Sequence, residues 1–137
     1  MKKILAIALV LCLAVGMLAG CAKTEAPAAA EKTFKVAMIC DSSISDGGWG
    51  AACYNGMTAA AESRGWETAY TDAIDQSAYA DTMISYCDLG YDMIFAPGNQ
   101  YSDAVKQVAA DYPNVAFAVL NGSTELPTAN IMSILPN

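Results

Sequence analysis

Histidine is absent from this chain of 137 residues, and basic residues are scarce. A chain without histidine lacks the commonest general base, the commonest metal ligand and the usual activator of a serine or cysteine nucleophile. Its 7 Lys and Arg residues stand against 14 Asp and Glu residues, which gives a net charge of −7 at pH 7. Such an acidic chain repels nucleic acid and anionic lipid headgroups. We therefore expect no enzyme activity, no metal or other cofactor, and no nucleic-acid partner.

Cysteine is infrequent and follows no metal-binding or redox spacing. Cys12 and Cys21 belong to the N-terminal segment described below, which leaves Cys40, Cys53 and Cys87 to explain. Each of these lies in an apolar stretch of an expected strand or helix, where cysteine packs as a small hydrophobic residue. Burial as reduced thiols is one interpretation, and a single disulfide between two of them is the alternative.

The first 20 residues have the pattern of a secretory signal peptide. Lys2 and Lys3 precede an apolar run over residues 4–15, which is too short for a lasting membrane span. The sequence Leu-Ala-Gly-Cys, which ends at Cys21, resembles the bacterial lipobox, whose cysteine is acylated and becomes the first mature residue. An ordinary signal peptide that contains a cysteine is the alternative. Residues 21–33 are small, charged and interrupted by proline, so we expect a lipid-anchored flexible linker there.

Residues 34–137 alternate between apolar runs and stretches of helical spacing, which is typical of a single α/β lobe. The chain that follows the signal peptide is long enough for one domain with a core and too short for two. Strands that alternate with helices pair in parallel through right-handed crossovers, so we expect a three-layer α/β/α sandwich with strand order 2-1-3-4-5. The expected strands are residues 34–40, 66–71, 91–96, 115–120 and 131–135, and the expected helices begin near Trp49, near Ser77 and after a capping Ser102.

Polar loops follow four of the expected strands, at residues 41–49, 71–75, 97–100 and 121–123. Parallel pairing brings all of these loops to the carboxyl edge of the sheet, where open α/β folds bind ligands. The loops hold carboxylates, amides, hydroxyls and one indole, and no cation. That mixture suits a neutral, hydroxylated, flat ligand, because carboxylates accept bonds from hydroxyls and an indole stacks on a ring. We expect the ligand contacts to be Asp41, Ser42, Asp46, Trp49, Asn99 and Asn121.

Each of these residues also has an interpretation without a ligand. Asp46 stands where the N-cap of a helix belongs and would bond the backbone N–H groups that follow it. Trp49 begins an apolar stripe and could belong to the core. Asp41 could simply end the first strand, and left-handed turn geometry alone could place Asn99 and Asn121.

Several short motifs follow one another along the chain in a specific order. They are the lipobox, the pattern Asp41-x-x-x-x-Asp46-x-x-Trp49, YNGM at residues 54–57, GYDMI at 90–94, and DYPNV with FAV within 111–119. Together they resemble the basic membrane protein family, the lipoprotein substrate-binding components of ABC importers typified by the purine nucleoside receptor. The resemblance runs over residues 34–135. It implies the N-terminal lobe of a periplasmic-binding-protein type I fold, without catalysis.

The same resemblance implies a role for single positions. In the family an aromatic residue after the second Asp stacks on the purine, and Trp49 stands at that place. The first Asp of the pattern or its neighbour reaches the ligand, which indicates Asp41 and Ser42. At the exit of the fourth strand the family commonly has an Asp that grips the base, whereas this chain has Asn121. An amide both donates and accepts, so the resemblance leaves the preferred edge of the base open.

By this resemblance the chain is the lipid-anchored N-terminal lobe of a nucleoside-type solute receptor, which works on the extracytoplasmic face of the cell membrane and delivers its ligand to an ABC permease. Family members continue into a second lobe that closes over the ligand, so the chain would be truncated or encoded apart from its other half. Half a cleft leaves one face of the ligand in water, and we therefore expect weak binding by this chain alone.

A function of another class is the alternative. In that case the chain is a single-lobe surface lipoprotein that contacts a permease or a sensor and binds no solute. An exposed apolar strip near residues 131–135 would favour it, because unpaired strands and apolar patches mark protein contacts.

Overall fold

The structure is a computed structural model that describes residues 32–122 and 128–135. The predicted signal peptide, the predicted lipidation of Cys21 and most of the predicted linker over residues 21–33 lie outside the described residues. Within the described ranges no helix has the length and apolar character needed to cross a membrane.

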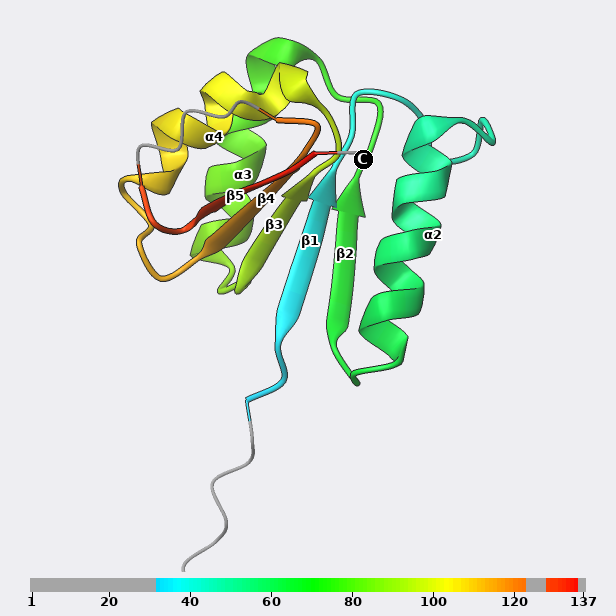
Figure 1. The fold of residues 1–137 in the computed structure, drawn as a ribbon, viewed down its shortest axis with the longest axis horizontal. Coiled ribbons are helices and arrows are strands. Elements are labelled where there is room, and N and C mark those ends of the chain that lie inside the picture. The colour runs from blue at the N-terminus through cyan, green and yellow to red at the C-terminus, as the bar shows by residue number, and fades with distance from the viewer. Residues whose placement is uncertain (1–31, 123–127, 136–137) are drawn as a thin grey trace, which may run out of the picture. The chain divides into compact units, whose positions relative to one another are not determined.

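In the described part of the chain, five parallel strands form one central sheet (Figure 1). Their order is β2-β1-β3-β4-β5, with parallel pairing between all neighbours, so the predicted strand order and α/β class are confirmed. The central strands have apolar sequences such as MIFA and AFAVL, because both of their faces are covered. The strands are β1 (Lys35–Ile39), β2 (Glu67–Thr71), β3 (Met93–Ala96), β4 (Ala116–Leu120) and β5 (Ile131–Ile134).

Helices cover the two faces of the sheet unequally. Helix α2 (Trp49–Glu62) lies on one face, and helices α3 (Tyr79–Asp88) and α4 (Ser102–Ala109) lie on the other (Figure 1). This arrangement confirms the predicted three layers. Helices α3 and α4 each follow a short 3₁₀ turn, η1 (Gln76–Ala78) and η2 (Asn99–Tyr101), which is a common way for a helix to begin.

Because of the second of these turns, the predicted role of Ser102 is wrong. Ser102 is the first residue of α4 and not its N-cap, since the chain is already wound into η2 at Asn99. The Ser102 hydroxyl instead donates to Asn99 Oδ1 over 3.2 Å.

Successive strand residues point to opposite faces of the sheet, which gives two separate cores. From β1, Ala37 and Ile39 point to the side of α3 and α4, whereas Val36 and Met38 point to the side of α2. The core under α3 and α4 is the larger one, and Tyr101 and Phe117 are wholly buried in it. The smaller core under α2 consists of Val36, Met38, Cys40, Cys53, Met57 and Ala61.

Cys40, Cys53 and Cys87 are free thiols, all of them buried, which agrees with the interpretation as small hydrophobic residues and not with a disulfide. Burial raises the pKa of Cys87 to about 11, and the neighbouring Asp88 carboxylate contributes to the rise. Burial also raises the pKa of Cys53. The raised pKa values make Cys53 and Cys87 poor nucleophiles at neutral pH.

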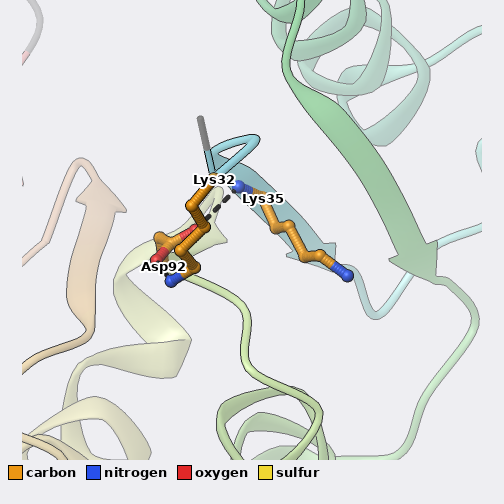
Figure 2. A network of polar contacts seen from close by, with 3 residues as sticks. All are labelled: Lys32, Lys35 and Asp92. Atoms are coloured by element: carbon orange, nitrogen blue, oxygen red, sulfur yellow. Dashed lines mark hydrogen bonds and ion pairs between the residues drawn. The ribbon is translucent and has the colours of Figure 1, made fainter. Parts of the chain in front are cut away.

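At the amino-terminal edge of the sheet, one carboxylate holds the start of the described chain. Asp92 pairs with the Lys32 ammonium and accepts a hydrogen bond of 2.9 Å from the Lys35 backbone N–H (Figure 2). Burial alone would raise the pKa of Asp92, but these two hydrogen bonds and the positive charges outweigh it and lower the pKa. The chain therefore enters the sheet at the edge opposite to the strand exits.

Residues from Lys32 onward contain a complete core. All members of both cores lie between Val36 and Ile131. A fragment of residues 22–137 is therefore expected to fold by itself.

Candidate functional site

The carboxyl ends of the parallel strands bring the predicted loops to one edge of the sheet, where β1 and β2 end at the top of Figure 1. Two non-glycine residues among those described have a positive φ, and both lie at this edge: Ala73 with φ 51° and Asn121 with φ 57°. Backbone strain of this kind is concentrated at functional sites. The edge is thus both polar and locally strained.

Asp41 is exposed and is held from below by residues of two other segments. Its Oδ2 accepts hydrogen bonds from Gln100 Nε2 over 2.9 Å and from the Tyr79 hydroxyl over 3.4 Å. Its backbone N–H donates to the Tyr101 hydroxyl oxygen over 2.7 Å. Within the described residues, Asp41 Oδ1 has no partner. This oxygen is oriented by its neighbours and available to a ligand hydroxyl.

The two tyrosines beneath Asp41 are buried and in contact, with ring centroids 4.5 Å apart. Burial raises the pKa of Tyr79, and the charge of Asp41 and its hydrogen bond raise it further. Burial also raises the pKa of Tyr101. Both phenols therefore remain protonated at neutral pH. They form an uncharged layer beneath the loops at the carboxyl edge of the sheet, residues 41–49, 71–75 and 97–100 with Asn121, which we call the rim.

Ser42 lies in the rim beside the start of α2. Its hydroxyl is 3.3 Å from Cys40 Sγ, and its backbone oxygen accepts a hydrogen bond of 3.3 Å from Ala73. A Cβ at Gly50 would come within 2.7 Å of both Cys40 Sγ and Ser42 Oγ. Gly50 therefore lets the helix begin in direct contact with the end of β1.

Asp46 is exposed and orders the loop, but it is not the N-cap of α2. The N-cap is Gly48, which makes no side-chain capping bond, so the predicted capping role is wrong. The predicted bond to Gly48 does exist, because Asp46 Oδ1 accepts from the Gly48 N–H over 2.7 Å. This bond closes a local turn over residues 46–48, directly before the helix, of a kind that Asp side chains commonly form. Asp72 Oδ2 fixes the same loop by accepting a 2.9 Å bond from the Ile44 N–H.

Trp49 is 59% exposed, so it is not a core residue. Its indole Nε1 donates to the Pro97 backbone oxygen over 2.6 Å, which joins the start of α2 to the exit of β3. A broad apolar ring thus lies at the carboxyl edge in a fixed position.

Asn99 and Asn121 differ in the hydrogen bonds that they make. Asn99 begins η2, and its Oδ1 accepts from Ser102, so its carbonyl side is already bonded. Asn121 is exposed at the end of β4 in the left-handed geometry that asparagine tolerates, and its backbone N–H donates to the Ile134 oxygen over 2.6 Å. The structure connects Asp41 with the loop of Asn99 through Gln100, and Trp49 with the same loop through Pro97. No such bond joins Asn121 to them among the described residues.

Sequence reasoning missed the residues that hold Asp41. Neither Tyr79, in the helix expected near Ser77, nor Tyr101, just after the loop at residues 97–100, was singled out from the sequence. Their signal is a phenol in an otherwise apolar pattern, because a buried hydroxyl needs a polar partner. In the described part of the chain no cluster of acidic residues and cysteines could hold a metal ion.

Comparison with known families gives one match, which covers most of the chain. Residues 33–135 match the family described as Bmp, ABC transporter substrate-binding protein PnrA-like. None of the curated proteins matches the chain.

Solved structures with the same fold include two solute-binding proteins of ABC transporters. The protein from Conexibacter woesei DSM 14684 is 20% identical, with a TM-score of 0.67, and covers 75% of this chain and 35% of its own length. The protein from Aeropyrum pernix K1 is 20% identical, with a TM-score of 0.65, over 73% of this chain and 28% of its own. This chain therefore spans about a third of these two proteins, and at such identity the likeness shows the fold alone.

A fragment of similar size is also similar in structure. It comes from Peptoclostridium difficile 630 and is named as a candidate lipoprotein. It is 24% identical, with a TM-score of 0.62, and the match covers 75% of this chain and 85% of the fragment.

Proposed function

The chain belongs to the family of PnrA-like substrate-binding proteins of ABC transporters, and from this premise we propose that it binds a nucleoside-like solute at the carboxyl edge of its sheet. The observation that carries the proposal is the pairing of an oriented carboxylate with a fixed indole at that edge. Asp41 is held by Tyr79 and Gln100, and Trp49 is held by Pro97. A hydroxylated ring system matches such a pair, because the indole stacks and the carboxylate accepts.

The proposed contacts divide by chemistry. The Trp49 ring stacks on the base, and Asp41 with Ser42 accepts bonds from ribose hydroxyls or base N–H groups. Asn121 presents an exposed amide that both donates and accepts. Asp46 acts mainly by ordering the loop, and Asn99 contributes through its amide nitrogen, since its oxygen is bonded to Ser102. These residues bind and orient a ligand, and we propose no catalytic step.

The proposal places the chain at the cell membrane, on the extracytoplasmic side, anchored by a lipid on Cys21 and serving an ABC permease. The geometry is compatible with this arrangement, because Lys32 and Asp92 hold the start of the described chain at the edge opposite to the rim. A rim that faces away from the anchor is open to solute. A function through protein contacts alone is not favoured by the family match.

Calorimetric titration of residues 22–137 with adenosine, guanosine and inosine tests the proposal. The described lobe covers a ligand from one side only, so we expect weak binding, with a dissociation constant of about 1 mM, or about −4 kcal/mol. Stacking of one base contributes about 1–3 kcal/mol. Trp49→Ala should therefore weaken binding about tenfold or more, and Trp49→Phe should keep most of it.

Trp66→Phe is the matched control, because Trp66 packs against Phe34 and Arg64 before β2 and away from the rim. It should leave the heat unchanged. Absence of heat with all three nucleosides at millimolar concentration would overturn the proposal. Equal losses from Trp49→Ala and Trp66→Phe would show that the rim is not the site.

A further inference from the structure

The Gln100 side chain joins two distant parts of the rim. Its Nε2 donates to Asp41 Oδ2 over 2.9 Å, although the two residues lie 59 positions apart in the sequence. The Tyr79 hydroxyl donates to the same oxygen over 3.4 Å, which is long for a hydrogen bond between two oxygens. Of these two side-chain donors, Gln100 therefore makes the stronger bond to the carboxylate. It is also exposed, so packing in a core does not explain its position.

Gly98 makes room for the Gln100 side chain. A Cβ at the buried Gly98 would lie 2.2 Å from Gln100 Oε1 and 2.6 Å from Gln100 Nε2, far inside contact distance. The backbone of Gly98 is extended, with φ 175°, and any residue adopts that conformation. Glycine serves here to let a side chain approach the backbone closely. The amide of Gln100 thus folds back over Gly98 on its way to Asp41.

The same short segment also holds the indole of the rim. The backbone oxygen of Pro97, next to Gly98, accepts the bond of 2.6 Å from Trp49 Nε1. Two residues later, the Asn99 side chain accepts from Ser102 and so ties the segment to the start of α4. Residues 97–100 therefore bond both Asp41 and Trp49. The position of the carboxylate relative to the ring depends on this one segment.

We propose that Gln100, placed by Gly98, is a positioning residue that makes the rim prefer nucleosides with ribose hydroxyls over nucleosides without them. The inference rests on the proposed function, because it takes Asp41 and Trp49 as ligand contacts. Gln100 itself does not touch the ligand. It occupies Asp41 Oδ2, so that Oδ1 is left for a ligand hydroxyl beside the ring that stacks on Trp49.

The carboxylate needs such a support because its own side chain does not fix it. The last torsion of an aspartate has a broad distribution, so an unsupported carboxylate of Asp41 would turn among several orientations. A group that is already oriented loses less entropy when the ligand binds. A carboxylate can only accept hydrogen bonds, so orienting it strengthens binding of a ligand that offers a hydroxyl and does nothing for one that lacks it.

Amide chemical shifts of ¹⁵N-labelled residues 22–137, followed during addition of inosine or 2′,3′-dideoxyinosine, test the proposal. The two ligands share one base and differ only in two ribose hydroxyls. Hydrogen bonds to charged groups are strong enough that we expect inosine to bind about tenfold more tightly. Gln100→Met keeps the size of the side chain but removes the donor, and it should lower this ratio to about two or less by weakening inosine alone.

Gly98→Ala tests the placement of Gln100 without changing Gln100. The new methyl group displaces the amide, which is the flexible end of a side chain, so the fold should remain and the ratio should fall as in Gln100→Met. The side-chain amide signals of Gln100 should also move in the chain without ligand. Two matched controls should keep the wild-type ratio. Gln107→Met changes another exposed glutamine, on α4, and Gly56→Ala adds a methyl group that meets nothing within 4 Å.

The possible results separate the inference from the function on which it rests. A wild-type chain that prefers inosine, with the same ratio in Gln100→Met and Gly98→Ala, would overturn the inference and leave the proposed function intact. Equal weakening of both ligands in these variants would show that Gln100 only supports the local fold, and equal affinities in the wild-type chain would also overturn the inference. Absence of binding by the wild-type chain to either ligand would overturn the proposed function, and the inference with it.

Discussion

The two faces of the sheet are built from neighbouring residues of the same strands, yet only one of them is fully covered. On the α3–α4 face, Ile94 and Phe117 are completely buried under two helices. On the α2 face, their neighbours Phe95 and Leu120 are only partly buried beside a single helix of small residues. Phe95 and Leu120 therefore form part of the surface, whereas Ile94 and Phe117 in the same strands belong to the core.

This difference separates two tasks within one lobe. The covered face supplies the rigid base of the rim, because Tyr79 and Tyr101 rise from it to hold Asp41. The open face supplies an uncharged surface that reaches the rim only at Trp49. Changes on the covered face should therefore reduce folding stability more than changes on the open face.

The largest effect is expected from a matched pair of phenylalanine substitutions in adjacent strands. Phe117→Ala removes a wholly buried ring and should lower the free energy of unfolding by about 3–5 kcal/mol. Phe95→Ala removes a partly buried ring and should cost less than about 2 kcal/mol. Urea unfolding of both variants measures the comparison. Equal losses would mean that the two faces are equally important to the fold.

A smaller loss is expected where the covered face meets the rim. Tyr101→Phe keeps the buried ring but removes the oxygen that accepts the Asp41 N–H, at a cost of about 1–3 kcal/mol. It should also weaken nucleoside binding, because Asp41 is no longer fixed. Tyr91→Phe, a change in a partly buried ring beside Tyr86, serves as the control and should leave binding unchanged. Unchanged nucleoside binding by Tyr101→Phe would show that the hydrogen bond from Asp41 to Tyr101, which joins the covered face to the rim, does not matter for binding.

Thiol alkylation compares the faces without disturbing either. Cys87 lies in the covered core, and its pKa of about 11 makes its thiolate fraction at pH 8 about 100-fold smaller than at the ordinary value of 9.0. Cys53 lies under α2 on the open face, so it should react with iodoacetamide before Cys87 does. Mass spectrometry after timed labelling of residues 22–137 gives the order. Labelling of Cys87 before Cys53 would contradict the conclusion that the face under α3 and α4 is the better covered of the two.

The smallest effect is expected at the amino-terminal edge of the sheet, which lies opposite to the rim. The pKa of Asp92 is lowered in the folded chain, so its stabilising contribution is present above the unfolded pKa of about 3.9 and is lost as the pH falls through the folded value. Asp92→Asn should therefore lower stability at pH 7 and change it little at pH 3. Thermal unfolding at both values measures the difference, and an equal loss at both would exclude the ionic contribution.

The strand order was predictable because it depends on local patterns. Apolar runs such as MIFA and AFAVL are buried on both faces, and their alternation with helices allows few topologies. The prediction that Asp46 is the N-cap of α2 was wrong, because the Asp46 side chain closes a separate turn before the helix begins. Local sequence does not distinguish these two uses of an aspartate, since both bond a nearby backbone N–H.

The support of Asp41 was not predictable for a different reason. Tyr101 and Gln100 lie about 60 residues further along the chain, and they meet Asp41 only through the register of β1 against β3. The incomplete cover of the α2 face also escaped prediction, because an apolar strand residue has the same sequence pattern under a helix or in the open. The apolar strip near residues 131–135, which the sequence analysis named as a sign of protein contacts, is formed by the exposed Met132, Ile134 and Leu135. The family match nevertheless does not favour a function through protein contacts alone.

Amide chemical shifts of ¹⁵N-labelled residues 22–137, recorded during addition of inosine, test most directly whether the carboxyl edge is the binding site. We expect shifts to move in residues 41–49, 97–100 and at Asn121, and to stay constant at Asp92 and Glu67 on the opposite edge. Shifts confined to Met132 and Ile134 on the α2 face, or no shifts at millimolar inosine, would contradict the account.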